Sequence, residues 1–304
     1  MILDPTDRLQ RALLSLDGLS VGDAFGQLMS TCATSARAVV EHGGLPLGPW
    51  WHTDDTQMAM AIVEGLAWNG KIVPDSLADR FVDRYQADPG RGYGKGARIQ
   101  LAEIARGTGW RQTSAAIFNG QGSKGNGGAM RSAPLGAWFA DDLAHVVSES
   151  AESAIVTHSH PEGVAGSVAV SLAAAAAWRA RSLPLEEARE QMWTTVIERT
   201  PAGETRDGLV QARSIAPSER AARAAGILGS GFLVTAADTV PFAVWCAARH
   251  LDNYSEALFA TLQGDGDCDT NCAIVGGIVA LYAGRESIPQ AWLESRERLD
   301  LQLP

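Results

Sequence analysis

A short acidic segment, residues 53–56, holds the side chains best suited to chemistry. Its sequence is Thr-Asp-Asp-Thr, and the apolar run of residues 58–63 follows it. A Thr or Asp ahead of such a run is typical of a helix N-terminus, so we expect a helix from Thr53 to about Trp68. Capping needs only one such group, and two adjacent carboxylates repel each other. Two carboxylates with two hydroxyls are, however, hard oxygen ligands suited to Mg²⁺, Mn²⁺ or Ca²⁺.

A second acidic segment, residues 264–270, repeats this pattern as Gly-Asp-Gly-Asp-Cys-Asp-Thr before the apolar run 272–281. Two helix starts that each present Asp and Thr could face each other across two metal ions about 3.5 to 4 Å apart. An EF-hand is excluded because loop position 6 is Thr270 instead of Gly and position 12 is Gly276 instead of Glu. The alternative is that these acids only complement helix dipoles.

Two glycine-rich segments are candidates for binding an anionic ligand. Residues 88–96 are dense in glycine, but their spacing matches neither a P-loop nor G-x-G-x-x-G. Residues 121–134 contain Gly-Asn-Gly-Gly-Ala-Met-Arg. The backbone N–H groups of such a turn, with Arg131 beside them, could bind a pyrophosphate; a plain loop is the alternative. His158, in Thr-His-Ser-His-Pro, is interpreted as a hydrogen-bond donor to a ligand, and the alternative is a capped, solvated histidine.

The elements that must position these residues are predicted to be helices. Apolar residues recur at steps of three and four from Thr6 to Leu28, where Gly18, Gly22 and Gly26 indicate close packing against another backbone. Further helices are expected over residues 75–85, 161–179, 185–199, 218–225, 241–248 and 254–262. Residues 29–49 show no sustained period, so we expect a long loop that acts as a flap. No stretch alternates at period two, so the chain is predicted to be all-α, with residues 1–304 forming one domain.

The bulk composition excludes several function classes. The chain has 304 residues, 35 acidic against 25 basic, and a net charge of −10. Nucleic acid is therefore disfavoured as a main partner, whereas a small anion held by a metal is compatible. The four cysteines show no zinc or disulfide spacing and are expected to be reduced and packed. The N-terminus lacks a basic signal-peptide region, and the alanine-rich run 164–178 is too short for a bilayer, so we expect a cytoplasmic protein with no membrane partner.

Five ordered elements together resemble the ADP-ribosylglycohydrolase family, which includes the dinitrogenase reductase-activating glycohydrolases. These are Gly-Asp-Ala-Phe-Gly at residues 22–26, the first acidic segment, Gly-Asn-Gly-Gly-Ala-Met-Arg at 125–131, Thr-His-Ser-His-Pro at 157–161, and Asp-Cys-Asp-Thr at 267–270. The resemblance implies a single compact orthogonal helical bundle with a central dinuclear site holding two Mg²⁺ or Mn²⁺ ions. It also implies hydrolysis of the N- or O-glycosidic bond that joins ADP-ribose to a modified protein side chain or a small conjugate.

The resemblance further implies the site residues. The metal ligands would be Thr53, Asp54, Asp55, Asp267, Asp269 and Thr270. Asp54 and Asp55 would be catalytic, with Asp55 acting as general base or acid. Substrate would be bound by Asn126, Gly127, Gly128, Met130, Arg131, His158, Tyr93 and Gly94. One departure is Ser30, where many members of the family carry a Glu on a mobile loop; Glu41 is the nearest acid downstream.

Two other functions are compatible with the same residues. A catalytically silent ADP-ribose-binding or structural protein, comparable to a lens crystallin, would use the same fold without turnover. A two-metal phosphoesterase would use the same carboxylates for an in-line displacement. In each case we expect a monomer.

Overall fold

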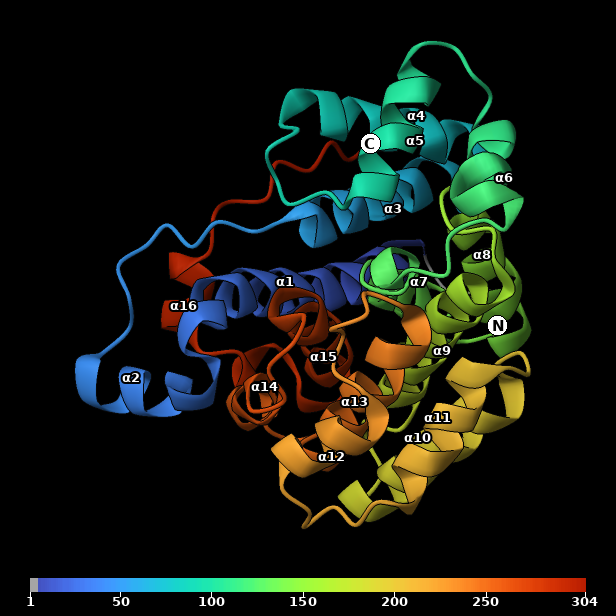
Figure 1. Cartoon of the computed structure of the whole chain (residues 1–304). Coiled ribbons are helices and arrows are strands. Elements are labelled where there is room, and N and C mark those ends of the chain that lie inside the picture. The colour runs from blue at the N-terminus through green and yellow to red at the C-terminus, as the bar shows by residue number, and fades with distance from the viewer. Residues whose placement is uncertain (1–4) are drawn as a thin grey trace.

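Residues 5–304, which the computed structural model describes, form sixteen α-helices and three 3₁₀-helices with no β-sheet among them (Figure 1). The all-α prediction is therefore confirmed. The helices are α1 (Pro5–Met29), η1 (Ser30–Ser35), α2 (Ala36–Gly43), α3 (Asp54–Asn69), α4 (Pro74–Ala87), α5 (Lys95–Ala105), α6 (Trp110–Gly120), η2 (Asn126–Gly128), α7 (Ala133–Trp138), α8 (Leu143–Ile155), α9 (Pro161–Arg179), α10 (Leu185–Arg199), α11 (Glu204–Ser214), α12 (Ala221–Leu228), α13 (Ala236–Arg249), α14 (Tyr254–Leu262), α15 (Cys268–Ala283), η3 (Arg285–Ser287) and α16 (Gln290–Ser295).

Helices α1 and α15 run antiparallel and pack backbone to backbone at the centre of the bundle. A Cβ atom on Gly22 would lie 2.1 Å from the carbonyl oxygen of Cys272, and Gly18 and Gly26 approach α15 just as closely. No side chain fits at such a distance, which explains the three glycines at four-residue spacing. The same contact brings the middle of α1 beside the first turn of α15, where the second acidic segment lies.

Helix α9 is buried along most of its length. Every residue from 165 to 177 is buried, and most of them are alanine. Helices α7, α8, α10, α13 and α15 all contact it, because small side chains on every face allow neighbours to approach from all sides. No helix within residues 5–304 is long and apolar enough to cross a bilayer.

The predicted flap, residues 29–49, is wrong as a long loop. Its first part folds into η1 and α2, and α2 stands out from the body in Figure 1. Arg37 on α2 pairs with Glu256 on α14 and lies over the ring of Phe259, 4.6 Å from its centroid. A helix of eight residues is too short to show a sustained hydrophobic period. Only residues 44–49 lack helical structure.

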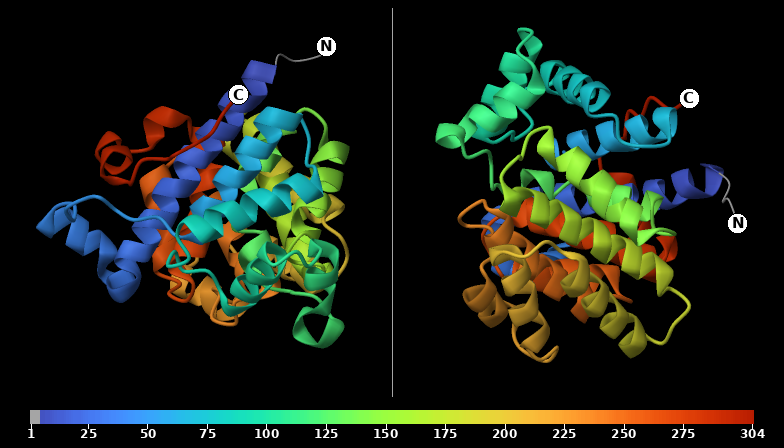
Figure 2. Two further views of the ribbon diagram at one scale, coloured as in Figure 1. Left: turned by 90° about the horizontal axis from the view of Figure 1, so that it is seen from above. Right: turned by 90° about the vertical axis from the view of Figure 1, so that its right-hand side faces the viewer.

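The C-terminal segment, residues 296–304, runs without helical structure across α3 and α4 (Figure 2). The backbone N–H of Gln302 donates to Glu64 on α3, and the indole of Trp68 donates to the Gln302 carbonyl. Asp300 pairs with Arg84 on α4. This segment therefore ties the last residues of the chain to the helix that begins at the first acidic segment.

Candidate active site

The two acidic segments meet. Asp54 and Asp55 stand in the first turn of α3, while Asp267 is the N-cap of α15 and Asp269 lies in its first turn. Carboxylate oxygens of Asp23, Asp55 and Asp269 all lie within 4.8 Å of one another. The side chains that the sequence separates by more than 200 positions therefore belong to one cluster.

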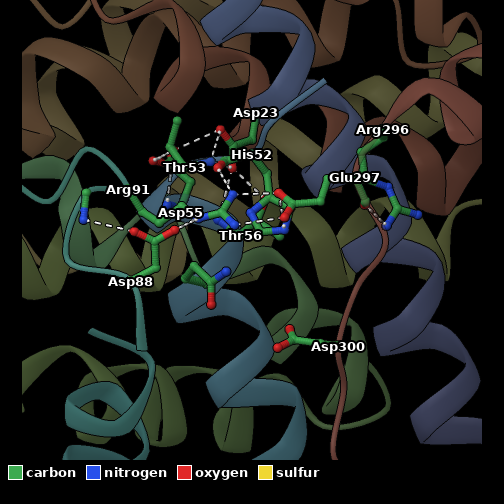
Figure 3. A network of polar contacts seen from close by, with 12 residues as sticks. Asp23, His52, Thr53, Asp55, Thr56, Asp88, Arg91, Arg296, Glu297 and Asp300 are labelled. Carbon is green, nitrogen blue, oxygen red and sulfur yellow. Dashed lines mark hydrogen bonds and ion pairs between the residues drawn. The ribbon is translucent and has the colours of Figure 1, made fainter. Parts of the chain in front are cut away.

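Asp23 is a member of this cluster that sequence reasoning missed. It is fully buried in the middle of α1 and holds the start of α3, since its carboxylate accepts hydrogen bonds from the backbone N–H groups of Thr53 and Thr56 at 2.9 and 3.1 Å (Figure 3). The hydroxyls of both threonines also donate to it. A single acid between packing glycines of a buried helix was the available signal, because an ionisable group is rarely buried without partners.

Thr53 caps α3 as predicted. Its hydroxyl accepts a hydrogen bond from the backbone N–H of Asp55 and lies 3.0 Å from the Oδ2 atom of that residue. On α15 the N-cap is Asp267, and Thr270 lies in the first turn, where its backbone N–H donates to Asp269. Asp267 accepts a 2.7 Å hydrogen bond from the side-chain amide of Asn126. These bonds orient the carboxylates toward a common centre.

The electrostatics of the cluster are those of a site that could hold a cation. Burial, and then repulsion from neighbouring carboxylates, raises the pKa of Asp23 to about 7 and that of Asp54 to about 8. Burial also raises the pKa of Asp267 to about 8, and the pKa of Asp55 lies well above its usual range. The Oδ1 atom of Asp55 is buried without a hydrogen-bond partner. A set of hard oxygen donors that disfavour their own charge, with one acceptor left over, fits a divalent cation.

The cluster lies at a cavity of about 580 Å³. Of the predicted site residues, the cavity is lined by Asp54, Asp55, Gly94, Asn126, Gly127, Met130, Arg131, His158, Asp267, Asp269 and Thr270. Its remaining walls come from the starts of α5 and α9, from the turn at residues 121–125 and from the loop at residues 233–235. Both glycine-rich segments thus border the same space as the acidic segments.

Two predicted substrate-binding residues do not line this cavity. Tyr93 is buried, and its ring packs edge-on against Tyr85 with 5.1 Å between the ring centroids. Gly128 is buried against α9, where a Cβ atom would lie 2.6 Å from the hydroxyl of Ser167. The sequence indicates that both segments reach the site, but not which residues of each turn point away from it.

His158 is held in one orientation by a short hydrogen-bond chain. Burial and the charge of Arg131 lower the pKa of His158 to about 3, so the ring is neutral. The Arg131 guanidinium donates to the Thr157 hydroxyl at 2.8 Å, and this hydroxyl lies 2.7 Å from Nδ1 of His158. This contact fixes the orientation of the ring, so that Nε2 faces Gly125 and Gly127.

Arg131 is fully buried, which the sequence did not indicate. Its guanidinium lies over the ring of Phe81, 4.4 Å from the centroid, and also donates to the carbonyl of Ser153. It lines the cavity, yet one of its terminal nitrogens already donates to both Ser153 and Thr157. The contacts observed for it orient His158 through Thr157.

Neither Ser30 nor Glu41 reaches the cavity. The Ser30 hydroxyl donates to the carbonyl of Gln27, and Glu41 lies on α2, 3.5 Å from Arg37. Neither residue lines the space between the two acidic segments. The acid that many family members place at the position of Ser30 thus has no counterpart from α2 in this arrangement.

The fold and site define an all-helical protein with a carboxylate cluster, suited to a cation, at one end of a ligand-sized cavity, and comparison with known proteins names the family. The family model described as ADP-ribosylglycohydrolase matches residues 4–303. The chain belongs to the ADP-ribosylglycohydrolase family. The resemblance drawn from the five motifs and the assignment as a hydrolase are both confirmed.

Several relatives cover most of the chain. ADP-ribosylhydrolase ARH3 from Bos taurus is 30% identical over 279 residues, which is 81% of this chain and 74% of the relative. ADP-ribosylarginine hydrolase Tri1 from Serratia proteamaculans is 23% identical and covers 96% of this chain and 77% of its own length. A solved structure titled ADP-ribosylglycohydrolase-related protein complex matches with a TM-score of 0.67 and 25% identity, over 96% of this chain and 94% of its own.

Proposed function

We propose that this protein hydrolyses the glycosidic bond that joins ADP-ribose to a modified protein side chain or to a small conjugate. The observation that carries the proposal is the convergence of the two acidic segments and Asp23 at one end of a cavity of about 580 Å³. The names of the relatives, an ADP-ribosylhydrolase and an ADP-ribosylarginine hydrolase, support the choice of substrate class.

Two Mg²⁺ or Mn²⁺ ions complete the proposed site. Thr53, Asp54, Asp55, Asp267, Asp269 and Thr270 would hold them, with Asp23 beside them. When bound, such ions supply positive charge that fixes the vicinal hydroxyls of the ribose and stabilises the charge that develops on the leaving group. The buried Oδ1 atom of Asp55, which has no other partner, supports this assignment.

Asp55 is proposed to handle the proton in the reaction. The Asp55 carboxylate lines the cavity and can accept a proton from the attacking water, as the water oxygen bonds to the anomeric carbon. The bond from that carbon to the departing nitrogen or oxygen then breaks, and Asp55 can return the proton to the leaving group. Asp54 is the second carboxylate that lines the cavity from α3.

The rest of the cavity is proposed to hold the ADP portion. Backbone N–H groups of Ser123, Lys124 and Gly127 are proposed as donors to the diphosphate, because those of Gly122, Gly125 and Asn126 already donate within the protein. Nε2 of His158 is proposed as a further donor, because Thr157 holds the ring with Nε2 facing Gly125 and Gly127. Gly94, Gly127 and Met130 lie along the same wall, while Asn126 has its amide directed at Asp267 and so contributes by orienting that carboxylate.

A product assay tests the proposal. Arginine-, serine- and acetyl-linked ADP-ribose conjugates are incubated with the protein and Mg²⁺ or Mn²⁺, and free ADP-ribose is measured by chromatography. We expect release from at least one linkage and none with Asp55→Ala. Absence of turnover on every linkage would contradict the proposal. Appearance of AMP or phosphate would select the two-metal phosphoesterase instead.

A catalytically silent ADP-ribose-binding or structural protein is the second candidate. It is favoured by Ser30 and by the position of Glu41 on α2, since neither supplies an acid to the cavity. Binding of ADP-ribose without release of product from any conjugate would support it.

A further inference from the structure

The guanidinium of Arg91 joins the C-terminal segment to the chain on both sides of the first acidic segment. Two of its nitrogens pair with the two carboxylate oxygens of Glu297 at 2.5 and 2.8 Å, and its Nε atom donates to Asp88 at 2.8 Å (Figure 3). It also donates to the backbone carbonyl of His52 at 3.0 Å. Every guanidinium nitrogen of Arg91 therefore has a partner.

The backbone of Arg91 in turn contacts the first acidic segment directly. Its carbonyl oxygen accepts a 2.7 Å hydrogen bond from the backbone N–H of Asp54, one of the N–H groups at the start of α3 that have no acceptor within the helix. At the next residue, Gly92, a Cβ atom would lie only 3.2 Å from Oδ1 of Asp54. A shift of Arg91 by a fraction of an ångström would therefore be felt at the carboxylate.

The C-terminal segment also pairs with the residues that precede the first acidic segment. The backbone N–H of Glu297 donates to the carbonyl of Trp50, and that of Trp50 donates to the carbonyl of Ser295. The imidazole of His52 lies 3.3 Å from the carboxylate of Glu297. The side chains of Arg91 and Glu297 are only 15% and 19% exposed, so solvent screens their pairing weakly.

We propose that Glu297 is a positioning residue for the cation site. Through the bidentate pair with Arg91, Glu297 fixes residues 91–92 on one side of the first acidic segment. It also fixes His52 on the other side, so that Asp54 and Asp55 keep their position relative to the start of α15. The proposal rests on the cation site of the proposed function. Partners that orient metal ligands without touching the metal typically change metal affinity by about 10- to 100-fold when they are replaced.

The test measures the affinity of the whole chain for Mn²⁺ alone, by isothermal titration calorimetry well below the unfolding temperature. Glu297→Gln keeps the size of the side chain but replaces one acceptor oxygen by a donor, so the bidentate pair with Arg91 is lost. We expect its Mn²⁺ affinity to fall by about 10-fold or more. Asp300→Asn is the matched control, because it removes the same charge from the same segment and, within residues 5–304, Asp300 pairs with Arg84 alone. Its affinity should stay within about twofold of wild type.

A second measurement separates positioning from general loss of stability. Arg91→Lys retains the positive charge without the planar fork, and the double variant Glu297→Gln with Arg91→Lys should be no weaker for Mn²⁺ than the weaker single variant. Provided that the wild type binds Mn²⁺, any of three results would overturn the proposal. These are unchanged Mn²⁺ affinity in Glu297→Gln, an equal loss of affinity in Asp300→Asn, and fully additive losses in the double variant. A wild-type protein that binds no Mn²⁺ would overturn the cation site itself and this proposal with it.

Discussion

Replacement of Gly22 by Ala should destabilise the fold and disturb the site together. The added Cβ atom would lie 2.1 Å from the carbonyl oxygen of Cys272 and 2.7 Å from its carbonyl carbon. Both are backbone atoms of α15, so no change of rotamer can relieve the contact. The two helices must separate, and Asp23, the next residue on α1, must move away from Asp269.

The magnitude follows from two opposing effects. Ala is a better helix former than Gly by about 1 kcal/mol in a helix interior. Overpacking of a tight interior costs about 1 to 3 kcal/mol, and more where the neighbour is rigid. Because the contact at Gly22 falls about 1 Å short of ordinary packing, we place the cost near or above the upper value, and the free energy of unfolding should fall by about 2 kcal/mol. For a chain of this size that lowers Tm by roughly 3 °C.

Gly226→Ala provides the matched control and should have the opposite sign. Gly226 lies on the exposed face of α12, where a Cβ atom would meet nothing within 4 Å. Only the helix propensity changes there, so stability should rise by up to about 1 kcal/mol. Scanning calorimetry and urea unfolding of the two variants measure the difference. Equal stability of Gly22→Ala and wild type, or a change of the same sign in both variants, would refute the packing argument.

Three further outcomes are expected for the acidic cluster. Asp55→Asn should lower kcat by at least about 100-fold, and retained turnover in a steady-state assay would count against the role of Asp55. The metal-free variant should be no less stable than the wild type, because one repelling charge is removed. The raised pKa values of Asp23, Asp54 and Asp267 mean that the metal-free folded state binds more protons than the unfolded state, so its stability should fall as pH rises from about 4 to about 8. Urea unfolding in the presence of a chelator measures the free energy of unfolding across this pH range. A free energy that rises with pH would be inconsistent with the raised pKa values. Addition of Mn²⁺ at pH 8 should raise the free energy of unfolding again, by about 2.7 kcal/mol at 100 times Kd; no change would argue against a cation.

Local chemistry was readable from the sequence, and long-range geometry was not. The start of α3 at Thr53 and the bounds of α10 and α14 follow from capping and periodicity, which depend on neighbours within a few residues. The convergence of the two acidic segments could be expected from their shared pattern. The acid between packing glycines marked Asp23 as unusual, but its partners were missed because they depend on where α1 lies relative to α3.

The same limit explains the errors within single segments. Helix α2 was missed because eight residues show too little periodicity, and Arg37 fixes it through a contact with a residue 219 positions away. Tyr93 and Gly128 lie in segments that border the cavity, as expected, but the direction in which each points depends on packing against Tyr85 and Ser167. The order of the motifs along the chain identified the family, whereas the partners of each side chain required the fold.

Anomalous diffraction from crystals grown with Mn²⁺ tests the central claim most directly. The account predicts two strong anomalous peaks between the first turns of α3 and α15, within bonding distance of Asp55 and Asp269. No peak at that place, or peaks only at surface carboxylates, would contradict it.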